Sequence, residues 1–280
     1  MVGITWARNS CLTCDACLAG RENLCEAGFQ GTYLGPAAGI WGKDPHHEHG
    51  GCMSKVMRIE ERFAIKLPDT LPPEVACPLI CGGGTVFEAV VNLVESGKSV
   101  AIASIGGLGT AAIRFARLFG GQVTALSRSD AKRGGAMKAG AHFFEACLGD
   151  TDKMANLAGK FDVIIDTNPT NPDIGPYMEM LKINGTYCKV GIPAASDMNF
   201  TYAWIPTICA QKKIAGSIIT GTRRMKRMME LAGNELDVFG KDNEEWHTET
   251  VHMTEVNEVM DKLKQGKAGH TYRYILKWDE

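Results

Sequence analysis

The sequence predicts an α/β protein in which a β-rich first part is followed by a doubly wound parallel sheet. From Ser99 onward, short apolar runs bounded by glycine alternate with segments of helical periodicity, the pattern of repeated βα units. Before residue 80 the chain is rich in Cys, Gly, Pro and His and holds only short strand-like pieces. A length of 280 residues suffices for one large domain or two ordinary ones.

We expect three parts along the chain, residues 1–80, 81–220 and 221–280. The first is the β-rich part and the second contains the parallel sheet. The pattern changes again after residue 220, and we expect this tail to return to the first domain. No internal repeat or low-complexity tract interrupts this order.

The first part gives few regular signals. Strand-like pieces lie at residues 52–59 and 63–67. A proline-rich loop then enters a helix, with proline at the helix start.

The second part alternates regularly. Periodicity is clearest in the first helix, where Ala112, Phe115 and Ala116 fall on one face. Strands are expected at residues 99–104, 122–127, 142–146, 161–167, 185–192 and 213–219, and helices at 108–120, 130–140, 152–158 and 173–182. In the tail we expect helices at 222–232 and 254–266 and strands at 248–253 and 271–278, with Thr254 as an N-cap and Gly266 just past the helix end.

The composition is that of an ordinary soluble protein, with 45% hydrophobic and 22% charged residues. A net charge of −2 gives no reason to expect a nucleic-acid partner or an anionic membrane surface. No apolar run approaches the roughly 20 residues needed to span a bilayer. Ten cysteines without a secretory signal indicate a reducing compartment, and we expect the cytoplasm.

The most specific motif is a set of four cysteines, Cys11, Cys14, Cys17 and Cys25, spaced C-x2-C-x2-C-x7-C. Four thiolates on a short loop can surround one tetrahedral Zn²⁺, and a site with four protein ligands is closed and structural. Two disulfides, or free or redox-active thiols, are the alternatives, and the reducing compartment disfavours the disulfides.

A glycine-rich turn, Ser104–Gly109, lies between the first strand and the first helix of the second part, where a dinucleotide fingerprint belongs. Gly106 lets the backbone approach a pyrophosphate, and Gly109 allows the helix to pack closely on the strand. The amides of Gly107 and Leu108 at the helix start offer an anion site. Ser104 replaces the first glycine of the pattern. A purely structural βα turn is the alternative.

The next strand indicates which dinucleotide is bound. It ends in Ser127 and Arg128, where an NAD site normally has a carboxylate for the ribose 2′-hydroxyl. Arg128 can form charge-assisted bonds to a 2′-phosphate, Ser127 can donate to it, and Lys132 follows one turn later. Asp130 is better placed as an N-cap than as a ribose ligand. These residues favour NADP over a merely solvated basic turn.

Together, the zinc loop, the turn Ser104–Gly109, the segment around Arg128 and the sequences PLICGGGTVFEAV, VGIP and IAGS resemble the zinc-containing medium-chain alcohol dehydrogenases, most closely the NADP-dependent cinnamyl-alcohol-dehydrogenase-like branch. The resemblance runs from about Gly3 to the end of the chain. It implies a GroES-like catalytic domain, partial here, followed by a Rossmann domain. It also implies hydride transfer between NADP(H) and an alcohol or aldehyde, and a homodimer formed through the edge of the Rossmann sheet.

Individual roles follow from the same resemblance. Cys81 matches a cysteine ligand of a second, catalytic zinc, which polarises the substrate oxygen in the family. By itself Cys81 would read as a small core residue. The matched cofactor contacts are Thr85, Val190, Gly191, Ser217 and Arg273.

The chain departs from the family at its start. Family members carry a C-x-x-[ST]-D type motif and a Gly-His-Glu motif that supply the other catalytic-zinc ligands and the proton relay, and neither occurs here. One cysteine does not hold a catalytic zinc. Two hypotheses follow: a fragment of a working reductase, or an NADP(H)-binding chain without zinc chemistry. A zinc-independent reductase of the same superfamily is disfavoured by the intact cysteine loop. We interpret His46–His49 as a solvated loop, with adventitious metal binding as the alternative.

Overall fold

The computed structural model describes residues 1–32, 51–197, 199–239, 246, 248–265 and 273–279. Contacts along the chain divide it into two compact units, residues 1–84 with 219–280, and residues 85–218. The histidine-rich loop His46–His49 and the expected helix-ending Gly266 lie outside the described residues.

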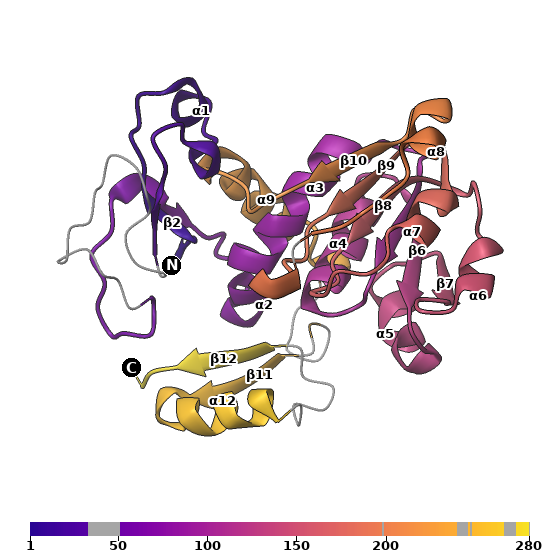
Figure 1. Ribbon diagram of the computed structural model, residues 1–280. Helices are drawn as coiled ribbons and strands as arrows, with labels where there is room; N and C mark the ends of the chain where they lie inside the picture. The colour runs from indigo at the N-terminus through magenta and orange to yellow at the C-terminus, as the bar shows by residue number, and fades with distance from the viewer. Residues whose placement is uncertain (33–50, 198, 240–245, 247, 266–272, 280) are drawn as a thin grey trace. The chain divides into compact units, whose positions relative to one another are not determined.

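Residues 85–218 are built around a six-stranded sheet in which every neighbouring pair is parallel (Figure 1). The strand order is β10-β9-β8-β5-β6-β7. The chain winds from β5 to β7 on one side and returns to β8 on the other, so the winding reverses between β5 and β8. This confirms the predicted doubly wound parallel sheet. The strands are β5 (Ser99–Ala103), β6 (Gln122–Ser127), β7 (Phe143–Ala146), β8 (Phe161–Asp166), β9 (Leu181–Lys189) and β10 (Lys213–Gly216).

The predicted helices connect these strands: α4 (Gly107–Leu118), η5 (Asp130–Lys132) with α5 (Arg133–Lys138), α6 (Thr151–Ala155) and α7 (Gly175–Met180). In addition, α3 (Gly84–Leu93) precedes β5, and η6 (Ala195–Asp197) and α8 (Trp204–Cys209), which were not predicted, lie between β9 and β10. The apolar face expected on α4 is buried, and Phe115 meets Phe87 of α3 edge-on at 5.0 Å between ring centroids. Face-to-edge packing of this kind is the favoured geometry of aromatic pairs.

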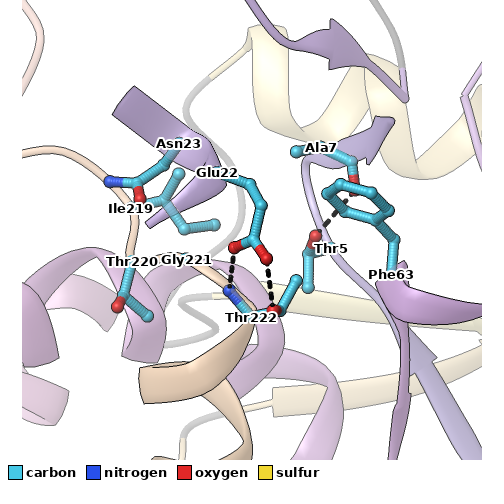
Figure 2. Close-up of a pocket in the computed structure, with 9 residues that line it drawn as sticks. All are labelled: Thr5, Ala7, Glu22, Asn23, Phe63, Ile219, Thr220, Gly221 and Thr222. Atoms are coloured by element: carbon cyan, nitrogen blue, oxygen red, sulfur yellow. Dashed lines mark hydrogen bonds between the residues drawn. The ribbon is translucent and has the colours of Figure 1, made fainter. Parts of the chain in front are cut away.

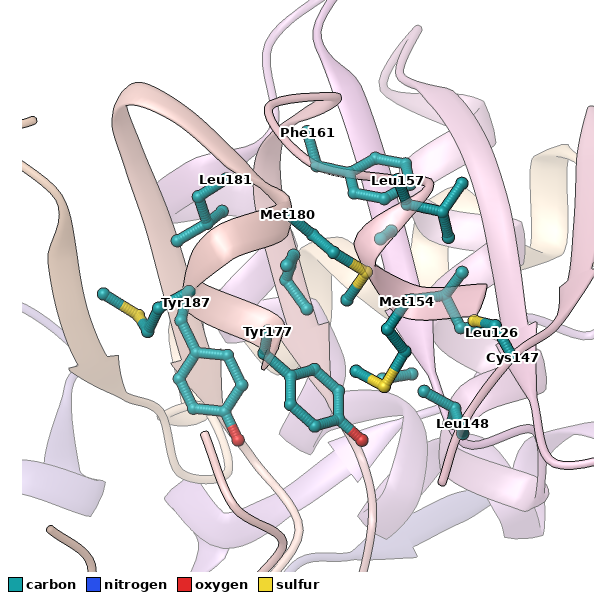
Figure 3. Packing of buried hydrophobic residues seen from close by; sticks show 14 of the residues in the cluster. Leu126, Cys147, Leu148, Met154, Leu157, Phe161, Tyr177, Met180, Leu181 and Tyr187 are labelled. Carbon is teal, nitrogen blue, oxygen red and sulfur yellow. The ribbon is translucent and has the colours of Figure 1, made fainter. Parts of the chain in front are cut away.

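A buried apolar cluster joins the sheet to α6 and α7 (Figure 3). Ala101 and Ala103 of β5 contribute one face of their strand to it. Because successive side chains of a strand point to opposite faces, Val100 and Ile102 pack on the other side. Both faces of β5 are therefore buried, which explains why its sequence is continuously apolar.

The other unit contains three two-stranded sheets, as far as the chain is described. β1 pairs with β4 and β2 with β3, both antiparallel, whereas β11 and β12 are parallel. Its elements are β1 (Val2–Ile4), β2 (Ala7–Asn9), α1 (Asp15–Leu18), η1 (Glu22–Leu24), β3 (Gln30–Gly31), η3 (Glu61–Phe63), β4 (Ala64–Lys66), α2 (Pro73–Pro78), η4 (Leu79–Gly83), α9 (Thr222–Asn234), α10 (Leu236–Phe239), β11 (Thr248–His252), η7 (Met253–Glu255), α12 (Val256–Lys264) and β12 (Arg273–Lys277).

The prediction of a strand at residues 52–59 is wrong. This segment forms no strand, and Val56 is 86% exposed. Its backbone is turned locally, because Ser54 donates from its amide to the Cys52 carbonyl and from its hydroxyl to the Val56 carbonyl. Such side-chain bonds compete with the ladder that a strand would need.

Two expected N-caps are also wrong. His252, not Thr254, caps the turn before α12, in a reciprocal capping box with Glu255. Asp130 lies inside η5, where its carboxylate accepts two bonds from the Arg133 guanidinium. A cap depends on where the backbone leaves the helix, which the residue type alone does not fix.

The continuous helical segment Pro73–Leu93 is long and apolar enough to cross a membrane, but 67% of its most apolar window is buried inside the protein. Mostly buried core helices of soluble proteins pass the same test of length and composition.

Candidate metal centre and nucleotide-binding loop

The four predicted cysteines converge at one point. The Sγ atoms of Cys11, Cys14, Cys17 and Cys25 all lie within 4.8 Å of one another. Four sulfurs arranged tetrahedrally about 2.3 Å from a zinc ion are separated by about 3.8 Å. The Sγ atoms of Cys11 and Cys17 are 3.8 Å apart. The donor set therefore fits a tetrahedral zinc ion with four thiolate ligands.

The backbone of the loop supports this arrangement. The Cys14 amide donates to Cys11 Sγ at 3.4 Å, and the Cys11 amide donates to Cys25 Sγ at 3.5 Å. Hydrogen bonds from backbone amides to sulfur stabilise thiolates and fix the orientation of the cysteine side chains. Leu12 adopts a φ of 61°, the left-handed conformation that lets the chain turn sharply between Cys11 and Cys14.

Cys11 differs from Cys17 and Cys25 in the direction in which its surroundings shift the thiol pKa. Backbone hydrogen bonds, first from Thr13 and then from Cys14, lower the pKa of Cys11 to about 6. Burial raises the pKa of Cys17 to about 12 and also raises that of Cys25. When a metal ion binds, it stabilises the thiolate form, so buried thiols of this kind would release their protons to solvent.

The cysteine loop is attached to the rest of its unit through Glu22, which lies between the last two cysteines. Glu22 is buried, and its carboxylate accepts bonds from the amide and hydroxyl of Thr222 at 2.9 and 2.8 Å (Figure 2). Thr222 is the first residue of α9, so the carboxylate neutralises the positive end of that helix. The cavity beside this contact has a volume of about 10 Å³, which holds a single water molecule and no substrate.

Cys81 lies in a different setting. It is in η4, a π-helical turn inside the long helix, and such turns occur frequently at functional sites. Within the described residues, the four-cysteine group is the one set of three or more His, Cys, Asp or Glu side chains placed to share a metal. Cys81 is outside it, and the described residues do not supply the three ligands of a catalytic zinc. Its assignment stays a prediction.

The glycine-rich turn lies at the carboxyl end of β5. Ser104 has a φ of 70°, so it adopts a left-handed conformation suited to the glycine it replaces. A side chain on Gly109 would place Cβ 2.2 Å from the Ser104 carbonyl oxygen, so the close approach of helix to strand excludes any other residue. Cβ on Gly106 would meet no atom within 4 Å, which leaves an open approach to the backbone of Gly107 and Leu108 at the start of α4.

The predicted ribose end is basic. Ser127 is buried at the end of β6, whereas Arg128 is exposed. Lys132 reaches back to the glycine-rich turn, where its ammonium group donates to the Ile105 carbonyl at 2.5 Å. Burial, and next the charge of Arg128, lower the pKa of Lys132. Two cations are thus held close together where a 2′-phosphate would supply compensating charge.

Other predicted cofactor contacts lie at the same edge of the sheet. Val190 and Gly191 follow β9, and their amides donate to the Asp166 carbonyl at 2.9 and 3.1 Å. Ser217 follows β10, and its hydroxyl is buried without a hydrogen-bond partner in the described structure, as expected of a group that awaits a ligand. Thr85 is in the first turn of α3. Arg273 begins β12 in the other unit, beside Gly82, and all of these roles stay predictions.

Sequence reasoning missed three residues at this edge, Asp166, Thr167 and Lys189. The available signal was a polar residue at the end of an apolar strand, FDVIIDT for β8 and TYCKVG for β9. Carboxyl ends of parallel strands meet at one edge, so such residues are expected to converge.

This chain is similar to known dehydrogenases over most of its length. The zinc-binding dehydrogenase family matches residues 107–234. A probable formaldehyde dehydrogenase of Bacillus subtilis is 35% identical over 98% of this chain and 74% of its own length. NADP-dependent alcohol dehydrogenase C 1 of Mycolicibacterium smegmatis is 32% identical, with the same coverage of 98% and 74%. A cinnamyl alcohol dehydrogenase of Sorghum bicolor superposes with a TM-score of 0.82 at 29% identity, covering 100% of this chain and 76% of that structure.

The parallel sheet, its glycine-rich turn and the neighbouring basic residues define a Rossmann-type dehydrogenase unit. The chain belongs to the zinc-containing medium-chain alcohol dehydrogenase family, in its cinnamyl-alcohol-dehydrogenase-like branch. The predicted family is confirmed.

We expect the cysteine loop to carry one tightly held zinc ion. Cys17→Ser removes a buried ligand, so zinc at this centre should be lost and the free energy of unfolding should fall by about 4 kcal/mol or more. Elemental analysis and thermal melting measure both effects. Cys209→Ser, at an exposed cysteine outside the loop, is the matched control and should retain the metal. Full zinc retention in Cys17→Ser would contradict the assignment.

Proposed function

We propose that this chain carries the activity of an NADP(H)-dependent alcohol dehydrogenase or aldehyde reductase with a small alcohol or aldehyde as substrate. The observation that carries the proposal is the basic ribose end, Ser127, Arg128 and Lys132, beside an open glycine-rich turn in a member of this family. The M. smegmatis relative is named as NADP-dependent, which supports the choice of cofactor.

The chain's own residues bind and orient the nucleotide. The amides at the start of α4 donate hydrogen bonds to the pyrophosphate, and the helix dipole favours its negative charge. Arg128 and Ser127 hold the 2′-phosphate, whereas Val190, Gly191 and Ser217 fix the nicotinamide end. NADPH, when bound, supplies the hydride, and the protein contributes its orientation. The described residues give no complete catalytic-zinc site, so we assign no step to that metal.

A second function is favoured by one observation, namely that Cys81 belongs to no described group able to hold a metal. On this alternative the chain binds zinc at the cysteine loop and NADP(H) at the sheet, without turnover.

Metal content and NADPH consumption separate the two functions. An active reductase should hold two zinc ions per chain and oxidise NADPH when an aldehyde is added, measured by absorbance and elemental analysis. One zinc ion with NADPH binding and no turnover would support the second function. Failure to bind either nicotinamide nucleotide would contradict both.

Cofactor choice is tested at Arg128. Arg128→Ala should weaken NADPH binding by about 10- to 100-fold, because charge-assisted hydrogen bonds to a phosphate are lost. NADH binding should change little, and titration calorimetry measures both. Arg133→Ala is the control, because that guanidinium is engaged by Asp130 and the Phe144 carbonyl. Equal losses for NADPH and NADH would refute the role of Arg128.

We also propose a homodimer formed through β10. In the described sheet β10 is an edge strand, and neighbouring α8 exposes Trp204, Ile205 and Ile208 by 75, 73 and 67%. An apolar surface next to an open strand edge is a typical association surface. A cytoplasmic location is proposed as well, supported by ten cysteines that form no disulfide.

A charged residue introduced on the exposed apolar side of α8 tests the proposed dimer. Ile208→Glu should shift the chain from dimer to monomer in sedimentation experiments, because a carboxylate would be buried at the interface. Met137→Glu, on exposed α5, should leave the dimer intact. A monomeric wild-type chain would overturn the proposal.

A further inference from the structure

A buried carboxylate lies at the carboxyl end of β8. Asp166 is fully buried, and its Oδ2 accepts bonds from the Tyr187 hydroxyl at 2.6 Å and from the Lys189 ammonium at 2.8 Å. Its Oδ1 accepts the Asn168 amide at 2.9 Å. A buried polar group costs several kcal/mol unless it is paired and hydrogen-bonded, so these three partners offset the cost of burying the Asp166 side chain.

Lys189 uses its remaining donors on the loop that follows β8. Besides Asp166, its ammonium group donates to the Asn168 and Thr170 carbonyls, both at 2.8 Å. An ammonium group has three donors, and all three are directed at residues 166–170. Tyr187 lies two positions earlier on the same face of β9. Burial, followed by the Asp166 charge, raises the pKa of Tyr187, so its phenol keeps the proton that it donates.

This loop is in turn bonded to the glycine-rich turn. The Thr167 hydroxyl donates to the Ser104 carbonyl at 2.7 Å and to the Ala103 carbonyl at 3.1 Å. Cβ on Gly109 would approach the Thr167 hydroxyl to 3.3 Å, and Cβ on Gly191 would lie 2.1 Å from the Asn168 carbonyl oxygen. Residues 167 and 168 therefore pack between the glycine-rich turn and the end of β9, where the winding of the sheet reverses.

We propose that Lys189, through Asp166 and the loop after β8, is a positioning residue for the pyrophosphate and nicotinamide portions of NADP(H). The inference rests on the proposed function, because it concerns the same nucleotide site. Lys189 does not touch the nucleotide on this reading. It holds the Ser104 turn and the Val190–Gly191 backbone in the spacing that the nucleotide requires, because the Asp166 carbonyl bonds to Val190 and Gly191 while the Thr167 hydroxyl bonds to Ser104.

The same two strands provide a matched comparison at their opposite ends. Lys182 of β9 donates to Asp162 of β8 at 2.8 Å, and Asp162 also accepts the Ser99 amide at 2.8 Å. This pair also joins β8 to β9, but it lies at the amino edge of the sheet. Ligands of open α/β sheets bind beyond the carboxyl edge, so Lys182 should contribute to stability alone.

The test compares Lys189→Met with Lys182→Met by calorimetry, with NADPH and the fragment 2′,5′-ADP as ligands. Lys189→Met should weaken NADPH binding about tenfold or more, because an unpaired buried carboxylate rearranges the loop. It should weaken 2′,5′-ADP less than about twofold, since the fragment reports the ribose end at Arg128. Lys182→Met should change both affinities less than about twofold while lowering the melting temperature.

The possible results distinguish failure of the proposed function from failure of the positioning role of Lys189. If the wild-type chain binds neither ligand, the proposed function fails. If the wild type binds NADPH and Lys189→Met binds it equally well, or loses both ligands in parallel, the positioning role is overturned. Should Lys189→Met not fold, Tyr187→Phe takes its place, because it removes one bond to Asp166 and keeps the ring. About a threefold loss for NADPH alone then supports the role, and unchanged NADPH affinity overturns it.

Discussion

The carboxyl edge of the parallel sheet depends on the hydrogen bonds that the buried carboxylate of Asp166 accepts. Its side chain is bonded by Tyr187, Lys189 and the Asn168 amide, and its carbonyl accepts the amides of Val190 and Gly191. One residue thus fixes the end of β8, the end of β9 and the loop between the sheet and α7. Because the charge is buried, removing a partner costs more than one ordinary hydrogen bond. The proposed nucleotide site lies at this edge of the sheet.

The other unit depends on a separate, short-range constraint. The cysteine loop contains its own ligands. Its described long-range hydrogen bonds to the start of α9 include the two that the Glu22 carboxylate accepts from Thr222 and the one from the Arg223 amide to the Gly20 carbonyl at 3.4 Å. A metal ion would therefore order a segment that has little apolar surface of its own, and Glu22 would transmit that order to a long helix. Structural zinc typically acts in this way, by replacing a missing core with coordination.

The sequence was sufficient wherever the signal was local. The cysteine spacing, the turn Ser104–Gly109 and the apolar periodicity of each βα unit all involve neighbours in the chain. Errors arose where local hydrogen bonds and backbone turns override the preference of the residue types. Residues 52–59 look like a strand but are turned by bonds of Ser54, and His252 replaces Thr254 as a cap because of where the backbone turns. Distant partners were a second source of omission. The Asp166–Lys189 pair was missed because its partners, 23 residues apart, meet only once the register of β8 and β9 is known.

The strand order has a consequence for how the site is assembled. Neighbours β5, β6 and β7 follow one another in the chain, as do β8, β9 and β10, so each half of the sheet forms from short connections. The join between β5 and β8 is different, since Thr167 and Ala103 are 64 residues apart. Closing that segment carries the largest chain-entropy cost in the sheet. During folding, the glycine-rich turn is thus completed by a contact between residues far apart in the chain, which is the kind that forms most slowly. The four ligands of the cysteine loop, by contrast, lie within 15 residues of one another.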